Sequence, residues 1–126
     1  MKAPVEDPRL KRVAAVCLAL PETACERKGG HASFLVRKKV FAYYLANHHN
    51  DRIISVCAKV LPGDNTSLAA GDAARFYLPA YIGPRGWVGL RLDAGKIDWD
   101  EVAELITGSY LLTAPKTLAA RVKVPE

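Results

Sequence analysis

Three strand-forming segments follow one another with only short turns between them, and this order restricts the fold. Residues 33–36, 40–45 and 53–60 are rich in valine, isoleucine and aromatic side chains, which is typical of strands. Strands joined by short turns pair antiparallel, because a parallel pair needs a crossover of a dozen or more residues. The sequence therefore predicts an antiparallel sheet at the centre of the molecule.

Two further segments extend this sheet. A short strand is expected at residues 25–28, before the Gly29-Gly30 bend. Another is expected at residues 87–92, with Trp87, Gly89 and Arg91 on one face and Val88, Leu90 and Leu92 on the other. We predict a single α+β domain over residues 1–126, with an antiparallel sheet of four to five strands and its helices packed on one face. The predicted core contains Val13, Val16, Phe41, Ile54, Val56, Val88, Leu90, Val102, Leu105 and Ile106.

Capping signals indicate where the helices begin. Asp7-Pro8 predicts a helix over residues 8–19, because an acceptor side chain precedes proline at the first helical position. Asp98 and Glu101 form a capping-box-like start to a long helix. A short helix is expected over residues 64–70, and Pro115 opens a last one.

Residues 76–92 combine the features that most indicate a function. Gly83-Pro84-Arg85-Gly86 predicts a tight turn with Gly86 at positive φ. The turn presents Arg85 at its tip, with Tyr81 before it and Trp87 after it. A turn leading into a core strand explains the same residues equally well.

Four segments carry a resemblance to a known family. Tyr81-Ile-Gly-Pro-Arg-Gly-Trp-Val88 resembles the signature of the MmcQ/YjbR family of small bacterial proteins. Residues 98–102, 114–121 and 17–21 are similar to that family too, and the resemblance extends over residues 9–121. It implies a compact α+β fold and DNA binding through a "double wing".

The positive charge is concentrated in the first half of the chain. The net charge is +5; residues 1–63 hold 11 basic and 5 acidic residues, residues 64–115 hold 4 and 7, and residues 116–126 hold 3 and 1. This asymmetry suits a polyanionic partner. A solvated basic surface without a partner remains the alternative.

The favoured function is weak, phosphate-directed binding of double-stranded DNA. Basic hairpin tips contact phosphates, which carry no sequence information, and no base-reading motif is evident. The residues expected to bind nucleic acid are Arg37, Lys38, Lys39, Arg85, Arg91 and Lys116.

The alternative is a module for a small ligand or a protein partner, with a cleft formed by Tyr81, Arg85 and Trp87. There Arg85 would hold a carboxylate or phosphate. A continuous basic stripe from residues 37–39 to Arg85 would favour DNA, whereas a pocket at the three residues of the cleft would favour a ligand.

Other classes of function find less support in the sequence. No catalytic, phosphate-loop or dinucleotide motif occurs, and the adjacent His48 and His49 do not supply the three or four ligands of a metal site. We therefore expect neither an enzyme nor a cofactor. Three cysteines without Cys-x-x-Cys spacing indicate free thiols in the cytoplasm, and no apolar run or signal peptide indicates a membrane or export.

Overall fold

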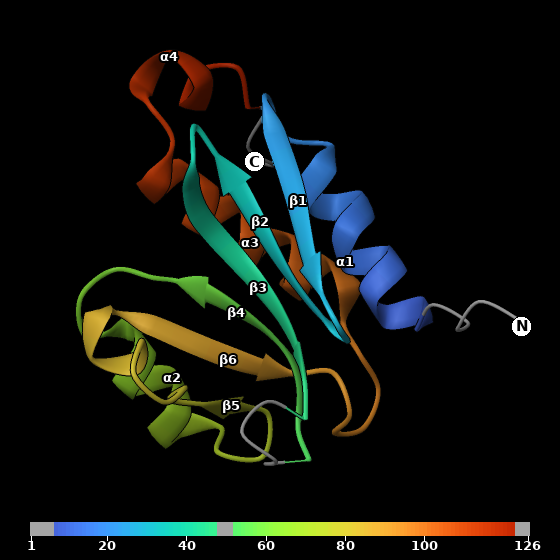
Figure 1. Ribbon diagram of the computed structural model, residues 1–126. Helices are drawn as coiled ribbons and strands as arrows, with labels where there is room; N and C mark the ends of the chain where they lie inside the picture. The colour runs from blue at the N-terminus through green and yellow to red at the C-terminus, as the bar shows by residue number, and fades with distance from the viewer. Residues whose placement is uncertain (1–6, 48–51, 123–126) are drawn as a thin grey trace, which may run out of the picture.

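The computed structural model describes residues 7–47 and 52–122. The chain forms one antiparallel sheet with helices packed against it (Figure 1). The order of strands in the sheet is β1-β2-β3-β4-β6-β5. The strands are β1 (Thr23–Lys28), β2 (His31–Val36), β3 (Lys39–Ala46), β4 (Ile54–Lys59), β5 (Phe76–Tyr77) and β6 (Trp87–Arg91).

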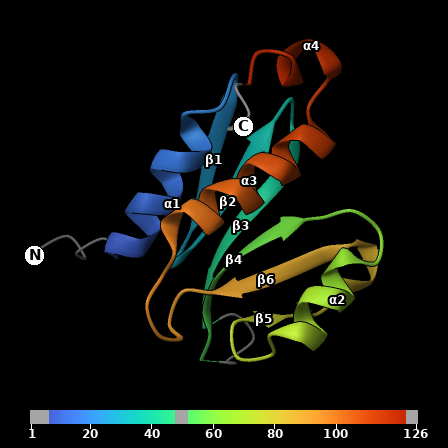
Figure 2. The ribbon, with the colours of Figure 1, turned by 180° about the vertical axis from the view of Figure 1, so that it is seen from behind.

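The helices cover one face of the sheet, as predicted. They are α1 (Pro8–Leu18), α2 (Asp64–Gly71), α3 (Trp99–Thr113) and the short α4 (Lys116–Ala119). Seen from behind, α1 crosses β1 and β2, α3 crosses β3 and β4, and α2 lies on β5 and β6 (Figure 2). Among the described residues, the opposite face of the sheet carries no helix, and we call it the open face.

The sheet has six strands where four to five were predicted. The additional strand is β5, in which Phe76 lies opposite Leu90 and Tyr77 lies opposite Gly89. A strand of two residues has no periodicity of its own, so the sequence pattern does not reveal it. It exists because the edge of β6 offers a partner for its backbone.

The predicted core residues pack between the helices and the sheet. Val13, Phe41, Val56, Val88, Leu90, Val102 and Ile106 are buried, while Val16, Ile54 and Leu105 are half-buried and pack against the same cluster. Phe41 meets Tyr110 of α3 edge to face, with ring centroids 5.4 Å apart. The predicted face assignment of β4, β6 and α3 is therefore confirmed.

Local signals account for the helix starts. The Asp7 side chain accepts a hydrogen bond from the Arg9 amide at 2.8 Å, and Asp98 accepts from the amides of Asp100 and Glu101. These carboxylates satisfy amides that have no partner within the helix. Both predicted capping residues are confirmed.

Candidate functional site

The hairpin between β2 and β3 has a tight basic turn. Val36 pairs with Lys39, so only Arg37 and Lys38 form the loop. Both have positive φ, at 50° and 68°, which is the conformation of a type I′ turn. Such a turn matches the twist of its strands and projects both side chains into solvent at the end of the hairpin.

One carboxylate lies among the cations at this end. Glu22 accepts from Arg37 Nε at 3.1 Å and from Nη2 at 3.3 Å, and its Oε2 lies 3.8 Å from Arg121 Nη1. All three side chains are substantially exposed. An exposed pair of this kind contributes little free energy and exchanges its partners readily.

The remaining cations at this end have no such partner. In both views α4 lies beside the turn between β2 and β3 (Figures 1 and 2). Lys38, Lys39 and Lys116 are exposed, and the described residues give none of them a carboxylate within ion-pair distance. We call Arg37, Lys38, Lys39, Lys116 and Arg121 the basic end.

Arg85 lies at a different corner of the molecule. The strands β2 and β3 diverge from β4 and β6, so the basic turn and the start of β6 are separated in both views (Figures 1 and 2). Arg85 closes the 3-10 turn Gly83–Arg85 and lines a cavity of about 830 Å³ with the exposed Leu61, Leu78 and Leu112. Among the described residues, the exposed Lys59 at the end of β4 also lines this cavity.

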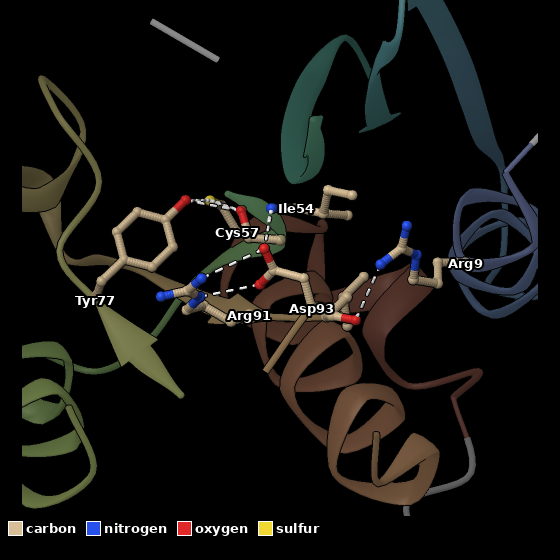
Figure 3. Close-up of polar contacts among 8 residues, drawn as sticks. Arg9, Ile54, Cys57, Tyr77, Arg91 and Asp93 are labelled. Atoms are coloured by element: carbon tan, nitrogen blue, oxygen red, sulfur yellow. Dashed lines mark hydrogen bonds and ion pairs between the residues drawn. The ribbon is translucent and has the colours of Figure 1, made fainter. Parts of the chain in front are cut away.

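Arg91 is held at the other end of β6. Its Nε donates to Asp93 Oδ1 at 3.0 Å, while Asp93 Oδ2 accepts from the Ile54 amide at 3.2 Å (Figure 3). Burial acts to raise the pKa of Asp93, but the hydrogen bonds from Arg91 and Ile54 outweigh it and hold the pKa below its ordinary value. Arg91 and Asp93 thus join the end of β6 to the start of β4.

The three residues of the alternative cleft do not share one cavity. Trp87 is 8% exposed and packs on Tyr43, with ring centroids 5.3 Å apart. Tyr81 is 81% exposed and lines a cavity on the open face, whereas Arg85 lines the cavity beside Leu61. Tyr81 precedes the 3-10 turn, Arg85 ends it and Trp87 begins β6, so the three side chains have different surroundings.

The open-face cavity contains residues that the sequence analysis did not single out. Tyr43 and Tyr77 form part of its wall, with His31 and Ser33 beside them. Alternation along residues 40–45 predicts that Tyr43 shares a face with Leu45. Tyr77 reaches the cavity because β5 pairs with β6, and the sequence pattern did not predict β5.

Comparison with known proteins identifies the family. The family model YjbR matches residues 18–112, which is most of the chain. The chain belongs to the YjbR family. The resemblance carried by residues 81–88 and 98–102 is thereby confirmed.

A solved structure shares the fold of this YjbR chain. The crystal structure of Deinococcus radiodurans protein DR2400, with family-model domain DUF419, matches with a TM-score of 0.69 and 20% sequence identity. The match covers 96% of this chain and 94% of that chain. At this identity the likeness concerns the fold alone. None of the curated proteins compared with the chain matches it.

The described residues contain neither a helix that could span a membrane nor a cluster of metal ligands. Across residues 7–47 and 52–122, none of the helices has the length and apolar character that a membrane span requires. In the same ranges, no three histidine, cysteine, aspartate or glutamate side chains converge as metal ligands would. His48 and His49 lie outside the described residues.

Proposed function

We propose that this YjbR protein binds double-stranded DNA weakly, through phosphate contacts made by its basic end. Arg37, Lys38 and Lys39 come from the hairpin turn, and Lys116 and Arg121 come from α4 and the residues after it. Arg85 and Arg91 do not belong to this surface. Only one wing of the "double wing" expectation therefore enters the proposal.

One observation carries the proposal: three exposed lysines gather at one end without carboxylate partners among the described residues. Lys38 projects from a two-residue turn, Lys39 begins β3, and Lys116 begins α4 beside that turn. Unpaired ammonium groups lose no existing ion pair on meeting phosphates. Phosphate contacts position a protein without reading bases, so the affinity is expected to be similar for all duplexes.

Glu22 limits the strength of this binding. To contact phosphates, Arg37 and Arg121 must give up their pairing with Glu22. The carboxylate also repels the phosphate backbone at short range. Removal of this single negative charge should therefore strengthen binding.

The test compares two variants that remove the same charge. Glu22→Gln frees both arginines, whereas Glu26→Gln removes an exposed carboxylate for which no ion pair is seen among the described residues. Fluorescence anisotropy with a labelled duplex at low salt should show about threefold to tenfold tighter binding for Glu22→Gln. Glu26→Gln should remain close to wild type.

Two results would contradict the proposal. One is an absence of duplex binding by the wild-type protein at low salt. The other is an equal effect of Glu22→Gln and Glu26→Gln, since this would reflect net charge alone. Duplexes of different sequence should give the same ranking of variants, because the contacts are made to phosphates.

A cytoplasmic location forms part of the proposal. Cys17, Cys25 and Cys57 are all free thiols, and Cys17 and Cys57 are buried. Burial raises the pKa of Cys17 far above its ordinary value, so this thiol stays protonated and unreactive. Free cysteines are the usual state in a reducing compartment such as the cytoplasm. In a bacterium this compartment also holds the DNA.

A further inference from the structure

The open face of the sheet holds a cavity with three tyrosines in its wall. Its volume is about 470 Å³, which lies within the usual range for sites that bind small molecules. Tyr43 and Tyr77 come from β3 and β5, and Tyr81 comes from the loop that follows β5. The cavity is separate from the basic end.

Two of these rings, those of Tyr43 and Tyr77, are held in place by neighbouring residues of the sheet. Tyr43 packs on the buried Trp87. The Tyr77 ring lies against Gly89, and its hydroxyl oxygen lies 2.7 Å from Ser55 Oγ, in a hydrogen bond that either hydroxyl can donate (Figure 3). Aromatic walls held in this way lose little conformational freedom when a flat ligand binds.

The third tyrosine stands on a strained backbone. Tyr81 has φ of 68°, and the Ile82 amide donates to the Ala80 carbonyl at 2.8 Å across it. When the amide of residue i+2 donates to the carbonyl of residue i and the residue between them has positive φ, the turn is the rare and strained form of γ-turn. A bulky residue seldom adopts this conformation, and such strain is concentrated at ligand clamps. Here it holds an 81% exposed ring at the rim of the cavity.

The polar side chains of the cavity can all donate hydrogen bonds. His31 Nδ1 accepts a hydrogen bond from the Ala46 amide at 3.2 Å, so the ring proton resides on Nε2. Ser33 contributes a hydroxyl and Lys28 an ammonium group at the rim. Among the described residues, no carboxylate lines the cavity; Glu26 lies opposite Ser33 on the neighbouring strand but is not part of the lining.

We propose that this cavity binds a small aromatic carboxylate. The ligand ring lies among Tyr43, Tyr77 and Tyr81, and its carboxylate lies on the side of Lys28, His31 and Ser33. Ring contacts with tyrosines supply apolar area and favourable edge-to-face geometry. The donors, and the absence of an acid among the described lining residues, favour an anion over a cation.

Three probes with one ring system test the chemistry: 2-naphthoate, 2-naphthamide and 2-naphthylmethylamine. Titration followed by protein NMR should show binding of the carboxylate, about threefold weaker binding of the neutral amide and weaker binding still of the amine. The shifted amides should include Ser33, Tyr43 and Tyr81. No binding of 2-naphthoate at millimolar concentration would overturn the proposal, and so would equal binding of all three probes.

Two pairs of variants test the residues. Tyr81→Gly should weaken 2-naphthoate binding about tenfold, while Arg52→Gly, at another exposed residue of positive φ, should leave binding unchanged. Lys28→Gln should abolish the preference for the carboxylate over the amide, whereas Lys11→Gln on α1 should not. Wild-type affinity in Tyr81→Gly, with an unfolding midpoint no lower than that of wild type, would contradict the proposed clamp.

Discussion

The ring of Tyr77 occupies the space that a side chain at position 89 would need. The two residues lie opposite each other on β5 and β6, and a Cβ on Gly89 would lie 2.3 Å from Tyr77 Cε1. Glycine at this position therefore allows Tyr77 to lie over the sheet and reach Ser55. Gly89 thus makes room for Tyr77, which lines the cavity on the open face.

Gly89→Ala should destabilise the protein. The new methyl group must displace the Tyr77 ring and break its hydrogen bond with Ser55, which should lower the free energy of unfolding by about 1–3 kcal/mol. Urea denaturation measures the loss. Gly71→Ala is the control, because a Cβ there meets no atom within 4 Å. A wild-type denaturation midpoint in Gly89→Ala would show that Tyr77 does not rest on the strand.

Gly86→Val should cost about 1–3 kcal/mol through backbone strain. Gly86 has φ of 93°, as the turn sequence predicts, and a β-branched residue is strongly disfavoured there. The Val60 amide also donates to the Gly86 carbonyl at 3.0 Å, so strain at this turn reaches the end of β4. Thermal unfolding provides the measurement, and an unchanged midpoint would refute the assigned turn.

Ser109→Ala should be among the most damaging single-atom changes in the core. The buried Ser109 hydroxyl donates to the Phe41 carbonyl at 2.6 Å and accepts from the Lys59 amide at 2.9 Å. It thus joins α3 to β3 and β4 where their own pairing ends. Loss of the hydroxyl leaves both backbone groups without this partner and should cost about 2–3 kcal/mol. Ser67→Ala, at an exposed position of α2, should be nearly neutral, and a similar small cost in both variants would contradict the account.

Asp93→Asn should reduce the dependence of stability on acidity. The pKa of Asp93 is lowered in the folded state, so its contribution is present above the unfolded value of about 3.8 and is lost as pH falls through the folded pKa. At pH 7 the variant should be less stable by about 1–2 kcal/mol, and the difference should vanish near pH 2. Urea denaturation across this range measures it. A difference that is independent of pH would mean that the Asp93 charge is not involved.

Much of the fold follows from local signals in the sequence. Asp7 and Asp98 begin helices because capping is decided within a few residues. The strand β5 (Phe76–Tyr77) was not predicted, because its existence depends on β6 as a partner and on Gly89 as a gap. The type of the hairpin turn was left open, since arginine and lysine are not the residues that usually signal positive φ.

The candidate site was less accessible to sequence reasoning. Lys38 and Lys39 were expected at an exposed tip, and exposure follows from a turn between two buried strands. The pairing of Arg37 with Glu22 joins residues 15 positions apart and depends on how β1 meets β2. Tyr81 and Arg85 are close in sequence, but the γ-turn and the 3-10 turn direct them into different cavities.

The most direct measurement of the DNA proposal is the salt dependence of duplex binding by Lys38→Ala/Lys39→Ala. If each lysine neutralises one phosphate, the slope of log K against log salt should fall in magnitude by about 1.8 relative to wild type. Lys96→Ala, which removes an exposed lysine from the loop before α3, should leave the slope unchanged. The account predicts the reduced slope for every duplex sequence tested. A double variant that binds with the wild-type slope would contradict the placement of the DNA site at the basic end.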